Sequence, residues 1–505
     1  MSTRQKKRVI LFFIFILILI LPVQINAQKQ NYINKLPANV AKRIYENRII
    51  YKSYDDYFHE FLNYVYYFSQ FEDEIPTELI KYKGENFLNI VSVKNAISDV
   101  EFLFKLLKFG YSAYQFFGGD KKFLEAKSNI IEEISQERFF PLISVSRLNN
   151  IIYENLSFIQ DGHFSIGHKD YIKFHYYYTN EEYDFYKDNN SYYTILDGER
   201  SYLISINGES AEKYMKLSLN FKGEIVYRIG QLLEEPVNNS IETNLSLRSR
   251  GEEINISLVL EEPDYDGVDF NNAYNSFKRK EITVIEQQTF HESTKNMDSL
   301  RKFVSDAYNL KNNKFLILDL RGNSGGSCKY PKQWIENYTG EKIDYLCGNY
   351  QLLTNTSIKM LLNTMKLNEN DPEIISNFEI DLNELKRIHK NGWYLVYPGA
   401  KNIKINNLLI VLTDSYISSA GEFFISLLNQ INNVIFIDSN TSGIYITGNN
   451  GTCKLPHSKL EVTFGTDLSL YPDFKFREGV GFSPDFWVNP ANSLELAVKF
   501  IKNYF

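Results

Sequence analysis

The chain has 505 residues, of which 44% are hydrophobic and 23% are charged, and its formal net charge is −7 at pH 7. A chain of this length holds about two to four domains, and its ordinary composition excludes disorder throughout. No long run of Lys and Arg occurs beyond the first eight residues, so nucleic acid is not expected as a partner.

The chain begins with a segment that resembles a targeting signal. Basic residues within Arg4–Arg8 precede an unbroken apolar run of 13 residues, Val9–Leu21, and Ala27 offers a cleavage site. The run is shorter than the roughly 20 residues that span a bilayer. We predict that residues 1–27 are a signal peptide and that the protein is exported, to the periplasm or outside the cell. An uncleaved N-terminal membrane anchor is the alternative.

The cysteines indicate neither a metal site nor a cofactor. An exported chain meets oxidising conditions, yet it has an odd number of cysteines, Cys328, Cys347 and Cys453. Their spacing resembles no metal-binding motif. Whether two of them form a disulfide is left open, because a chain of this length can bury a sufficient core without one.

Residues 28–170 are expected to be mostly helical. Apolar residues recur three and four positions apart in Asn86–Lys108 and in Phe123–Ile134, with few Gly or Pro. This spacing is typical of amphipathic helices.

Residues 171–265 have a different pattern. Short aromatic and β-branched runs alternate with turn pairs such as Asn207-Gly208. We predict a small β-rich module, in which Ser201–Ile206 is a strand, Ser210–Leu217 a helix and Ile254–Leu260 the last strand.

Residues 266–505 follow an α/β pattern. Short continuous apolar runs are typical of buried strands, and helical stretches lie between them. The expected strands are Ile282–Ile285, Phe315–Leu320, Leu408–Leu412 and Val434–Ile437, and the expected helices are Ser293–Ala307 and Ala420–Leu428. The long polar segment 331–400 is expected to be an insert or a lid.

A glycine-rich loop, Asp319–Gly326, directly follows one expected strand. Glycine allows turns that are closed to other residues, and free N–H groups in such a loop can bind an oxyanion. A turn that only redirects the chain would have the same composition, so both interpretations stay open. No Gly-Lys-Ser/Thr follows, which excludes a P-loop.

Two adjacent serines, Ser418 and Ser419, stand where an expected strand gives way to the helix Ala420–Leu428. The helix dipole and the next N–H group favour a nucleophilic hydroxyl at this junction. Serine is also a common helix cap, so the position alone identifies no nucleophile. A serine nucleophile needs a base, and the segment Gln160–Phe164 offers His163, one of seven histidines.

Together these stretches resemble the serine peptidases that include the C-terminal processing (tail-specific) peptidases and the tricorn core proteases. That family pairs an Asp-Leu-Arg-x-Asn-x-Gly-Gly loop, here Asp319–Gly326, with a later Ser-Ala-x-Glu, here Ser419–Glu422. A third family element, Gly-Val-x-x-x-Pro-Asp, is present as Gly479–Asp485. The stretch Ile204–Gly208 resembles part of the family's PDZ-like insert. The resemblance covers about residues 150–505.

The resemblance implies an α/β fold with a ββα-type core of the ClpP and crotonase kind. It divides the chain into a signal peptide and three regions. These are 1–27, the N-terminal helical region 28–170 with the Asp-Gly-His motif, the PDZ-like module 171–265, and the catalytic core 266–505 with the insert 331–400.

The resemblance also implies the nucleophile, which is Ser419, with Ser418 as its competitor. The processing-peptidase branch uses a Ser–Lys dyad whose Lys lies in a Thr-x-Gly-Lys-type turn. The matching turn here is Thr441–Gly443 followed by Ile444, and Lys454 lies ten residues further on. We therefore expect no Ser–Lys dyad.

The tricorn branch instead uses Ser, His and Glu. Its His lies in an Asp-Gly-His element before the PDZ-like module, and its Glu lies shortly before the Gly-Val segment; His163 and Glu478 occupy those places. The implied relay is Ser419, His163 and Glu478. The branch has a further small polar residue beside the His, and Gly162 stands there, so that fourth member is in doubt.

The oxyanion hole implied by the resemblance uses backbone N–H groups of Ala420 and of Gly325 or Gly326. Glu478 has a competing interpretation as a solvated charge next to Arg477. Arg321 is expected to hold its loop through a carboxylate, and Asp485 to cap a loop.

We therefore expect an exported serine peptidase that hydrolyses peptides or unfolded proteins. The alternatives are a binding protein for apolar ligands or peptides on the same fold, and an esterase using the same serine. No stable membrane insertion is expected beyond the signal segment. The substrate, the oligomeric state and recognition of C-termini by the PDZ-like module are left open.

Overall fold

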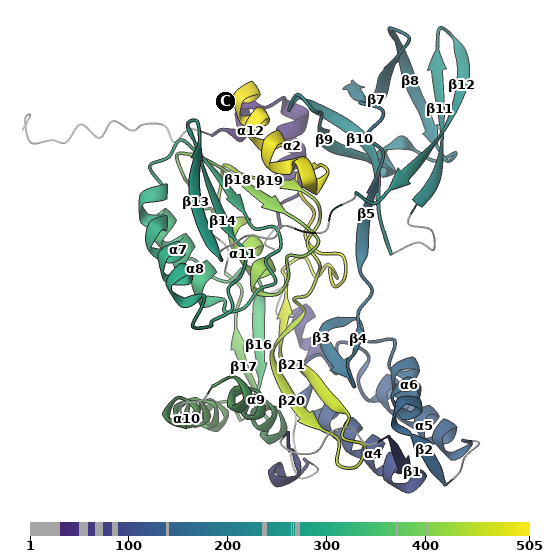
Figure 1. The fold of residues 1–505 in the computed structure, drawn as a ribbon, viewed down its shortest axis with the longest axis vertical. Coiled ribbons are helices and arrows are strands. Elements are labelled where there is room, and N and C mark those ends of the chain that lie inside the picture. The colour runs from purple at the N-terminus through teal and green to yellow at the C-terminus, as the bar shows by residue number, and fades with distance from the viewer. Residues whose placement is uncertain are drawn as a thin grey trace, which may run out of the picture.

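The computed structural model describes residues 31–49, 59–65, 74–82, 89–137, 141–234, 240–263, 265, 267, 273–369, 372–390, 392–399 and 401–505. Figure 1 shows an elongated molecule with the α/β core and a β-rich module in its upper half. The N-terminal helices lie at the lower end, and a second sheet runs between them and the core. The predicted signal peptide lies outside the described residues.

The core contains a sheet in the order β13-β14-β15-β18-β19-β22. Only β13 is antiparallel to its neighbour, and β14 to β22 are parallel. Every residue of β15, β18 and β19 is buried, as expected of parallel strands covered on both faces. The strands are β13 (Tyr274–Arg279), β14 (Ile282–Gln287), β15 (Phe315–Asp319), β18 (Leu408–Thr413), β19 (Val434–Asp438) and β22 (Phe486–Trp487).

Helices cover both faces of this sheet, which confirms the predicted α/β class. Because successive strand residues point to opposite faces, Leu316 and Leu318 pack with one set of helices and Phe315 and Ile317 with the other. The first set is α7 (Met297–Leu310), α8 (Lys329–Thr339) and α11 (Ala420–Leu428); the second is α2 (Ala38–Glu46) and α12 (Ser493–Tyr504).

The N-terminal region, for which helices were expected over 28–170, has three helices among the described residues between 93 and 155. Ser92 and Ser144 cap two of its helices, because their side chains accept hydrogen bonds from the N–H groups of Asn95 and Arg147. The region comprises β1 (Ile90–Ser92), α4 (Val93–Gly110), α5 (Gly119–Ser135), β2 (Leu142–Ser144) and α6 (Val145–Asn155).

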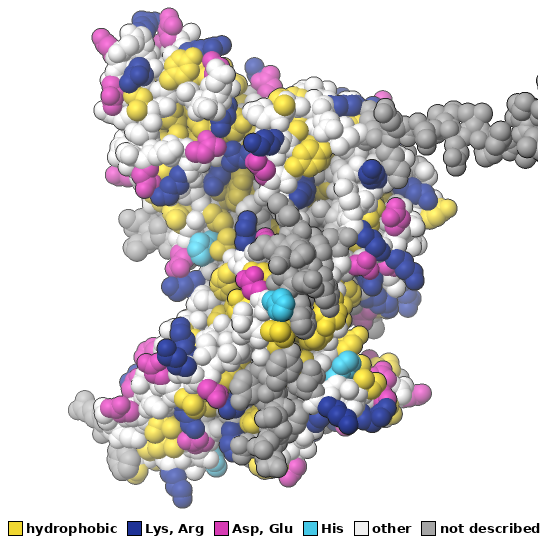
Figure 2. All heavy atoms as spheres, turned by 180° about the vertical axis from the view of Figure 1, so that it is seen from behind, with side chains coloured by type: hydrophobic (Ala, Val, Ile, Leu, Met, Phe, Trp, Pro, Cys, Tyr) yellow, Lys and Arg dark blue, Asp and Glu magenta, His cyan; other side chains and the backbone are white. Residues whose placement is uncertain are grey.

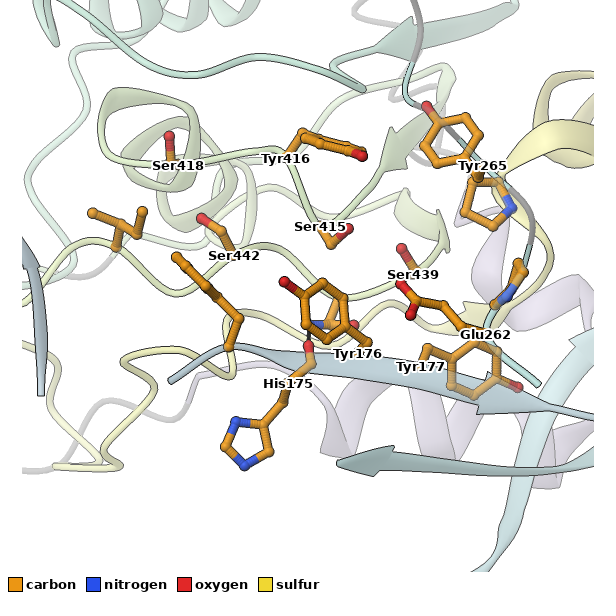
Figure 3. Close-up of a pocket in the computed structure, with 15 residues that line it drawn as sticks. His175, Tyr176, Tyr177, Glu262, Tyr265, Ser415, Tyr416, Ser418, Ser439 and Ser442 are labelled. Carbon is orange, nitrogen blue, oxygen red and sulfur yellow. Dashed lines mark hydrogen bonds between the residues drawn. The ribbon is translucent and has the colours of Figure 1, made fainter. Parts of the chain in front are cut away.

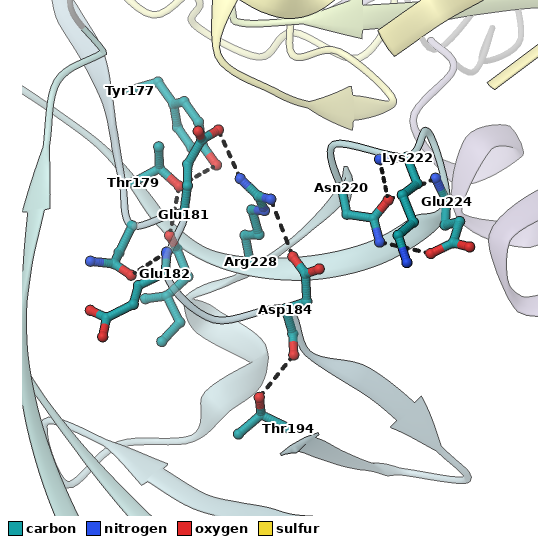
Figure 4. Close-up of polar contacts among 12 residues, drawn as sticks. Tyr177, Thr179, Glu181, Glu182, Asp184, Thr194, Asn220, Lys222, Glu224 and Arg228 are labelled. Carbon is teal, nitrogen blue, oxygen red and sulfur yellow. Dashed lines mark hydrogen bonds and ion pairs between the residues drawn. The ribbon is translucent and has the colours of Figure 1, made fainter. Parts of the chain in front are cut away.

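The module that follows is a sheet in the order β6-β7-β8-β11-β12-β5-β10-β9. Arg228 on β10 is almost fully buried, and its guanidinium pairs with Glu181 at 2.8 Å and Asp184 at 3.1 Å, which ties the β5–β6 loop to the sheet (Figure 4). Its strands are β5 (His175–Thr179), β6 (Tyr186–Asp188), β7 (Ser191–Leu196), β8 (Glu199–Ile206), β9 (Met215–Leu219), β10 (Ile225–Glu234), β11 (Ser240–Ser249) and β12 (Glu252–Glu261).

One prediction within the module is wrong. The segment Ser210–Leu217 is not a helix: a single 3-10 turn, Ala211–Lys213, leads into strand β9. The side chains Met215, Leu217 and Leu219 are all buried at a spacing of two, which is the strand period, and β9 pairs with β10.

The sheet between the core and the N-terminal helices has the order β17-β16-β21-β3-β4, with β20 paired to β21. Strand β3 carries the Asp-Gly-His motif, so the N-terminal part of the chain enters a sheet built mostly by the C-terminal part. Its strands are β3 (Asp161–Ile166), β4 (Lys169–Tyr171), β16 (Gly348–Leu352), β17 (Trp393–Val396), β20 (Thr447–Lys454) and β21 (Glu461–Leu470).

The segment 331–400 contributes to this sheet as well as to helices. It holds most of α8, then β16, α9 (Asn355–Asn368), α10 (Pro372–Ile388) and β17. Strand β16 pairs directly with β21, so part of this segment is built into the sheet.

Within the described residues, no helix combines the length and the apolar character needed to cross a membrane. Positively and negatively charged side chains are interspersed over the face seen in Figure 2. All three cysteines are free, with Cys328 exposed and Cys347 and Cys453 buried.

Candidate active site

Ser419 lies between β18 and α11 with an unusual backbone conformation. Its φ of 51° and ψ of −117° fall where residues other than glycine are rarely found. Its N–H donates to the Ile444 carbonyl at 2.8 Å, and its carbonyl accepts from the Phe423 N–H. The Ser419 side chain makes no capping hydrogen bond. The strained turn therefore leaves the hydroxyl unused by the helix.

The neighbouring Ser418 points elsewhere. Its hydroxyl donates to the Ser324 carbonyl at 3.0 Å, and it lines a different hollow from Ser419. The two serines therefore lie in different surroundings, and only Ser419 shares a cavity with His163.

The glycine-rich loop is anchored by Arg321. The Asp319 carboxylate accepts from Arg321 Nε at 2.8 Å and from Nη2 at 2.6 Å, and Arg321 Nη1 donates to the Pro490 carbonyl. This confirms the expected role of Arg321. Gly322 donates its N–H to the carboxylate of Asp414 at the end of the adjacent strand. The loop is thereby held at the carboxyl edge of the parallel sheet, beside Ser419.

Two glycines bring this loop close to its neighbours, Gly325 to Ser419 and Gly326 to Phe290. A Cβ on Gly325 would lie 2.9 Å from Ser419 Cβ, and one on Gly326 would lie 2.1 Å from the Phe290 carbonyl carbon. Both have positive φ, 91° and 129°. Only glycine fits this close approach.

The two glycines differ in what their N–H groups do. Gly325 donates its N–H to Asn323 Oδ1 at 3.0 Å. In contrast, the N–H groups of Gly326 and Ala420 donate to no acceptor within the described part of the chain. Of the two glycines considered from the sequence, Gly326 is the one with a free donor.

His163 lies on β3, next to a bulge in the pairing with β4. The Asp161 carboxylate fixes the backbone there: it accepts from the His163 N–H at 2.8 Å, from the Thr447 hydroxyl and from the Tyr111 hydroxyl. The buried His163 Nδ1 has no hydrogen-bond partner. Burial lowers the pKa of His163, outweighing the Asp161 charge and the Thr447 backbone, which raise it.

Glu478 is buried and contacts the backbone on either side of the site. Its Oε1 accepts from the Gly162 N–H at 3.0 Å, and its Oε2 accepts from the N–H groups of Tyr445 and Ile446. Burial raises its pKa well above the ordinary range, and the nearby Asp161 charge adds to this. Among the described residues, no hydrogen bond joins Glu478 to the His163 ring. The carboxylate instead accepts a hydrogen bond from the backbone N–H of Gly162, the residue before His163.

One cavity brings most of these groups together. It has a volume of about 300 Å³. Its lining combines the core loops around Ser419 with strands of the second sheet: His163, Gly326, Ser327, Cys328, Tyr345, Cys347, Asn349, Ser419, Ala420, Phe423, Tyr445, Thr447, Gly448, Asn449, Asp467, Ser469 and Tyr471. Glu478 and Gly325 are not among the residues that line it. The polar strand residues Asn349, Asp467 and Ser469 belong to no local motif, so no sequence pattern singles them out.

A second hollow of about 300 Å³ lies on the Ser418 side. It is bounded by β5 of the module and by core loops, and Figure 3 shows Tyr176 and Tyr177 on the side of Ser415, Ser439 and Ser442, while the His175 ring points away from them. The module and the core thus enclose a hollow beside the candidate nucleophile.

Comparison with known proteins identifies the core. Residues 281–488 match the family model described as peptidase family S41. This part of the core is similar to the S41 peptidases. The match confirms the predicted recognition and the predicted enzyme class, a serine-type peptidase. It does not extend to His163, which lies 118 residues before the matched region begins.

Solved structures with a related arrangement are distant. Mature CPAF is 14% identical, with a TM-score of 0.42 over 82% of this chain and 95% of that chain. The photosystem II D1 C-terminal processing protease is 11% identical (TM-score 0.35; 81% and 98%), and the tricorn protease is 14% identical (0.34; 81% and 37%). No curated protein matches the chain.

Proposed function

We propose that this S41 peptidase is exported and hydrolyses peptides or unfolded proteins with Ser419 as nucleophile and His163 as general base. The observation that carries the proposal is the shared cavity: two side chains 256 residues apart in sequence line one hollow. The strained Ser419 backbone and the unpartnered Nδ1 of His163 support it further. No hydrogen bond joins the two side chains without substrate; catalytic hydrogen bonds are often long in that state and tighten in the Michaelis complex.

The reaction follows from these positions. His163 takes the hydroxyl proton as Ser419 Oγ attacks the peptide carbonyl carbon, and the carbonyl oxygen becomes an oxyanion. The free N–H groups of Ala420 and Gly326 bind that oxyanion. His163 then gives the proton to the leaving amine, and water, deprotonated by the same ring, hydrolyses the acyl-enzyme.

Glu478 is the acidic member of the proposed relay. Its carboxylate accepts hydrogen bonds from the N–H groups of Gly162, Tyr445 and Ile446. Gly162 is the residue before the proposed base. It thereby fixes the strand that carries the imidazole against the core. In this role Glu478 is a positioning residue.

The hollow on the Ser418 side offers a path for an extended substrate. It runs from strand β5 of the module to Ser418, the residue before Ser419, and its lining is rich in tyrosine and serine. A peptide lying there would reach Ser419 with one carbonyl and place neighbouring residues against the module. The PDZ-like module then helps to hold the chain that is cut.

Labelling with a fluorophosphonate, read by intact-protein mass spectrometry, tests the nucleophile. Wild type and Ser418→Ala should gain the mass of one adduct, whereas Ser419→Ala should gain none. Ser418→Ala is the matched control, because it removes an adjacent hydroxyl that lies in the other hollow. Labelling of Ser419→Ala at the wild-type rate would reject the assignment.

A panel of unfolded-protein, peptide and ester substrates separates the remaining functions. A peptidase cleaves the peptides, and Ser419→Ala loses on the order of 10⁶-fold in kcat. Turnover of esters alone would indicate an esterase. Turnover of nothing, together with saturable binding of an apolar ligand, would favour a carrier.

A further inference from the structure

The wall of the active-site cavity opposite Ser419 carries an unusual carboxylate. Asp467 lies on β21 and lines the cavity together with Asn349 on β16 and Gly448 on β20. Its side chain is almost completely buried, at 6% exposure. None of the residues that line the cavity is Lys or Arg.

Only one of the two oxygens of Asp467 is satisfied. Its Oδ2 accepts from Asn349 Nδ2 at 3.0 Å and from Asn449 Nδ2 at 2.9 Å. Its Oδ1 is buried and has no hydrogen-bond partner. Asp467 takes part in no ion pair within the described residues. A buried carboxylate normally has a cation or a full set of donors, because an unmatched buried charge is costly.

Gly448 lies directly beside this buried oxygen. A Cβ at Gly448 would lie 2.8 Å from Asp467 Oδ1, closer than real Cβ atoms come to a neighbour. Gly448 and Asp467 are register partners in adjacent strands. Any side chain at that position would therefore press on the Asp467 carboxylate and shift it.

The titratable groups that act on Asp467 do not neutralise it. Burial raises the pKa of Asp467 to about 6; the Asn349 amide and the Gly448 backbone lower it, and the Asp161 charge raises it. The nearby thiols Cys328 and Cys347 carry no positive charge. Asp467 is therefore mostly ionised at neutral pH, with no cation from the protein facing it.

We propose that Asp467 gives this peptidase a preference for Lys or Arg at the substrate residue whose carbonyl Ser419 attacks. The inference rests on the proposed function of Ser419. A long basic side chain places its methylene stem against the aromatic walls, Tyr345, Phe423 and Tyr471, while its charged end lies beside the Asp467 carboxylate in the cavity wall. An ammonium or guanidinium supplies the counter-charge that this carboxylate lacks.

The test uses two aminoalkyl diphenyl phosphonates, one with a lysine side chain and one with the uncharged norleucine side chain. In the labelling step, Ser419 Oγ forms a bond to phosphorus, a P–O bond to phenoxide breaks, and the hydroxyl proton leaves with the phenol. The ratio of the two labelling rates isolates the charged group, because the stems have the same length.

Wild type should label with the lysine probe about 30-fold or more faster than with the norleucine probe. In Asp467→Asn this ratio should collapse toward one. Asp170→Asn, which removes an exposed carboxylate from β4 of the same sheet, should keep the wild-type ratio. Gly448→Ala, which displaces the carboxylate and leaves the charge of Asp467 in place, should also lower the ratio.

The outcomes separate this inference from the proposed function. Equal labelling rates for the two probes in wild type, or an unchanged ratio in Asp467→Asn, would overturn the role of Asp467 and leave the nucleophile intact. Labelling of Ser419→Ala would instead overturn the proposed function. Labelling by neither probe would contradict both.

Discussion

Burial of the His163 ring lowers its pKa below the ordinary value of 6.5, so the ring is unprotonated and ready to accept a proton at neutral pH. A general base works in its neutral form. The pH at which activity is lost on acidification therefore follows the lowered pKa of His163.

We predict that kcat/KM for an uncharged norleucine substrate falls on acidification with an apparent pKa below 6.5. An uncharged substrate is chosen so that Asp467 does not contribute. His163→Ala should lower kcat/KM by at least about 10⁴-fold, and the exposed His168→Ala by less than about twofold. A pH profile of each variant measures this; an acid limb above 6.5 would contradict the assignment.

Local motifs predict some of these residues and not others. Ser419, the glycine loop and His163 could be singled out because each belongs to a short motif of consecutive residues. The contacts of Glu478 could not, because they are made with backbone N–H groups, which no sequence pattern encodes. Asp467 was missed because its partner Asn349 lies 118 residues away in sequence and is joined to it only through strand pairing.

The loop between β19 and β20 is the element on which the site is built. Ser419 donates its N–H to the Ile444 carbonyl, and the buried Glu422 accepts from the Thr441 hydroxyl and from the N–H groups of Gly443 and Ile444. Burial raises the pKa of Glu422 to about 7. In peptidases with a Ser–Lys dyad the lysine would stand at this position of the loop. Here the position holds the apolar side chain of Ile444.

Strand β3 packs closely against this loop because Gly162 has no side chain. A Cβ at Gly162 would lie 2.7 Å from Ile444 Cγ1 and 2.8 Å from Ile444 Cγ2. We predict that Gly162→Ala destabilises the protein by about 1–3 kcal/mol through overpacking. The same substitution in an Ile444→Ala background should cost less, by a coupling of about 0.5–3 kcal/mol.

Urea unfolding of the wild type, the two single variants and the double variant measures this coupling. Additive effects of the two substitutions would show that β3 and the loop do not meet at this point. The contact also explains why a glycine, and no polar residue, stands beside His163.

Secondary structure was predictable where local pattern and tertiary environment agree. Helix α11 begins and ends where the sequence indicated, because its apolar residues are buried all round. Strand β9 was mistaken for a helix, since the pairing with β10, rather than local propensity, decides its conformation. Asn492, a residue type that often caps helices, precedes α12, but its side chain makes no capping hydrogen bond.

The whole molecule is held together by contacts between segments distant in sequence. Arg48, after helix α2, forms hydrogen bonds with both oxygens of Asp485 at 2.8 and 2.9 Å, and donates to the Val434 carbonyl. Asp485 is completely buried at its side chain and also accepts from the Phe436 N–H. Asp485 therefore joins the segment around Arg48 to the core. This contact goes beyond the loop cap that was expected of Asp485.

Arg48→Met should lower the free energy of unfolding by about 3–5 kcal/mol, because it leaves a buried carboxylate without its cation. Lys42→Met is the matched control: Lys42 pairs with Glu46 on the exposed face of α2, and its loss should cost less than about 1 kcal/mol. Urea denaturation gives both values. Equal midpoints for the two variants would show that the N-terminal segment does not stabilise the core.

The proposed base and nucleophile lie 256 residues apart in the sequence, and the second sheet brings the base to the core through the pairing of β3 with β21. That the two residues meet in one site could be anticipated from the order of the motifs in the sequence. The geometry of the site could not be anticipated, because it depends on the pairing of strands from separate parts of the sequence. A crystal structure of the lysine phosphonate adduct tests it most directly. The phosphorus should be bonded to Ser419 Oγ, with a His163 ring nitrogen within about 3.2 Å of that oxygen. An adduct on another residue, or a His163 ring out of reach of Ser419, would contradict the proposed site.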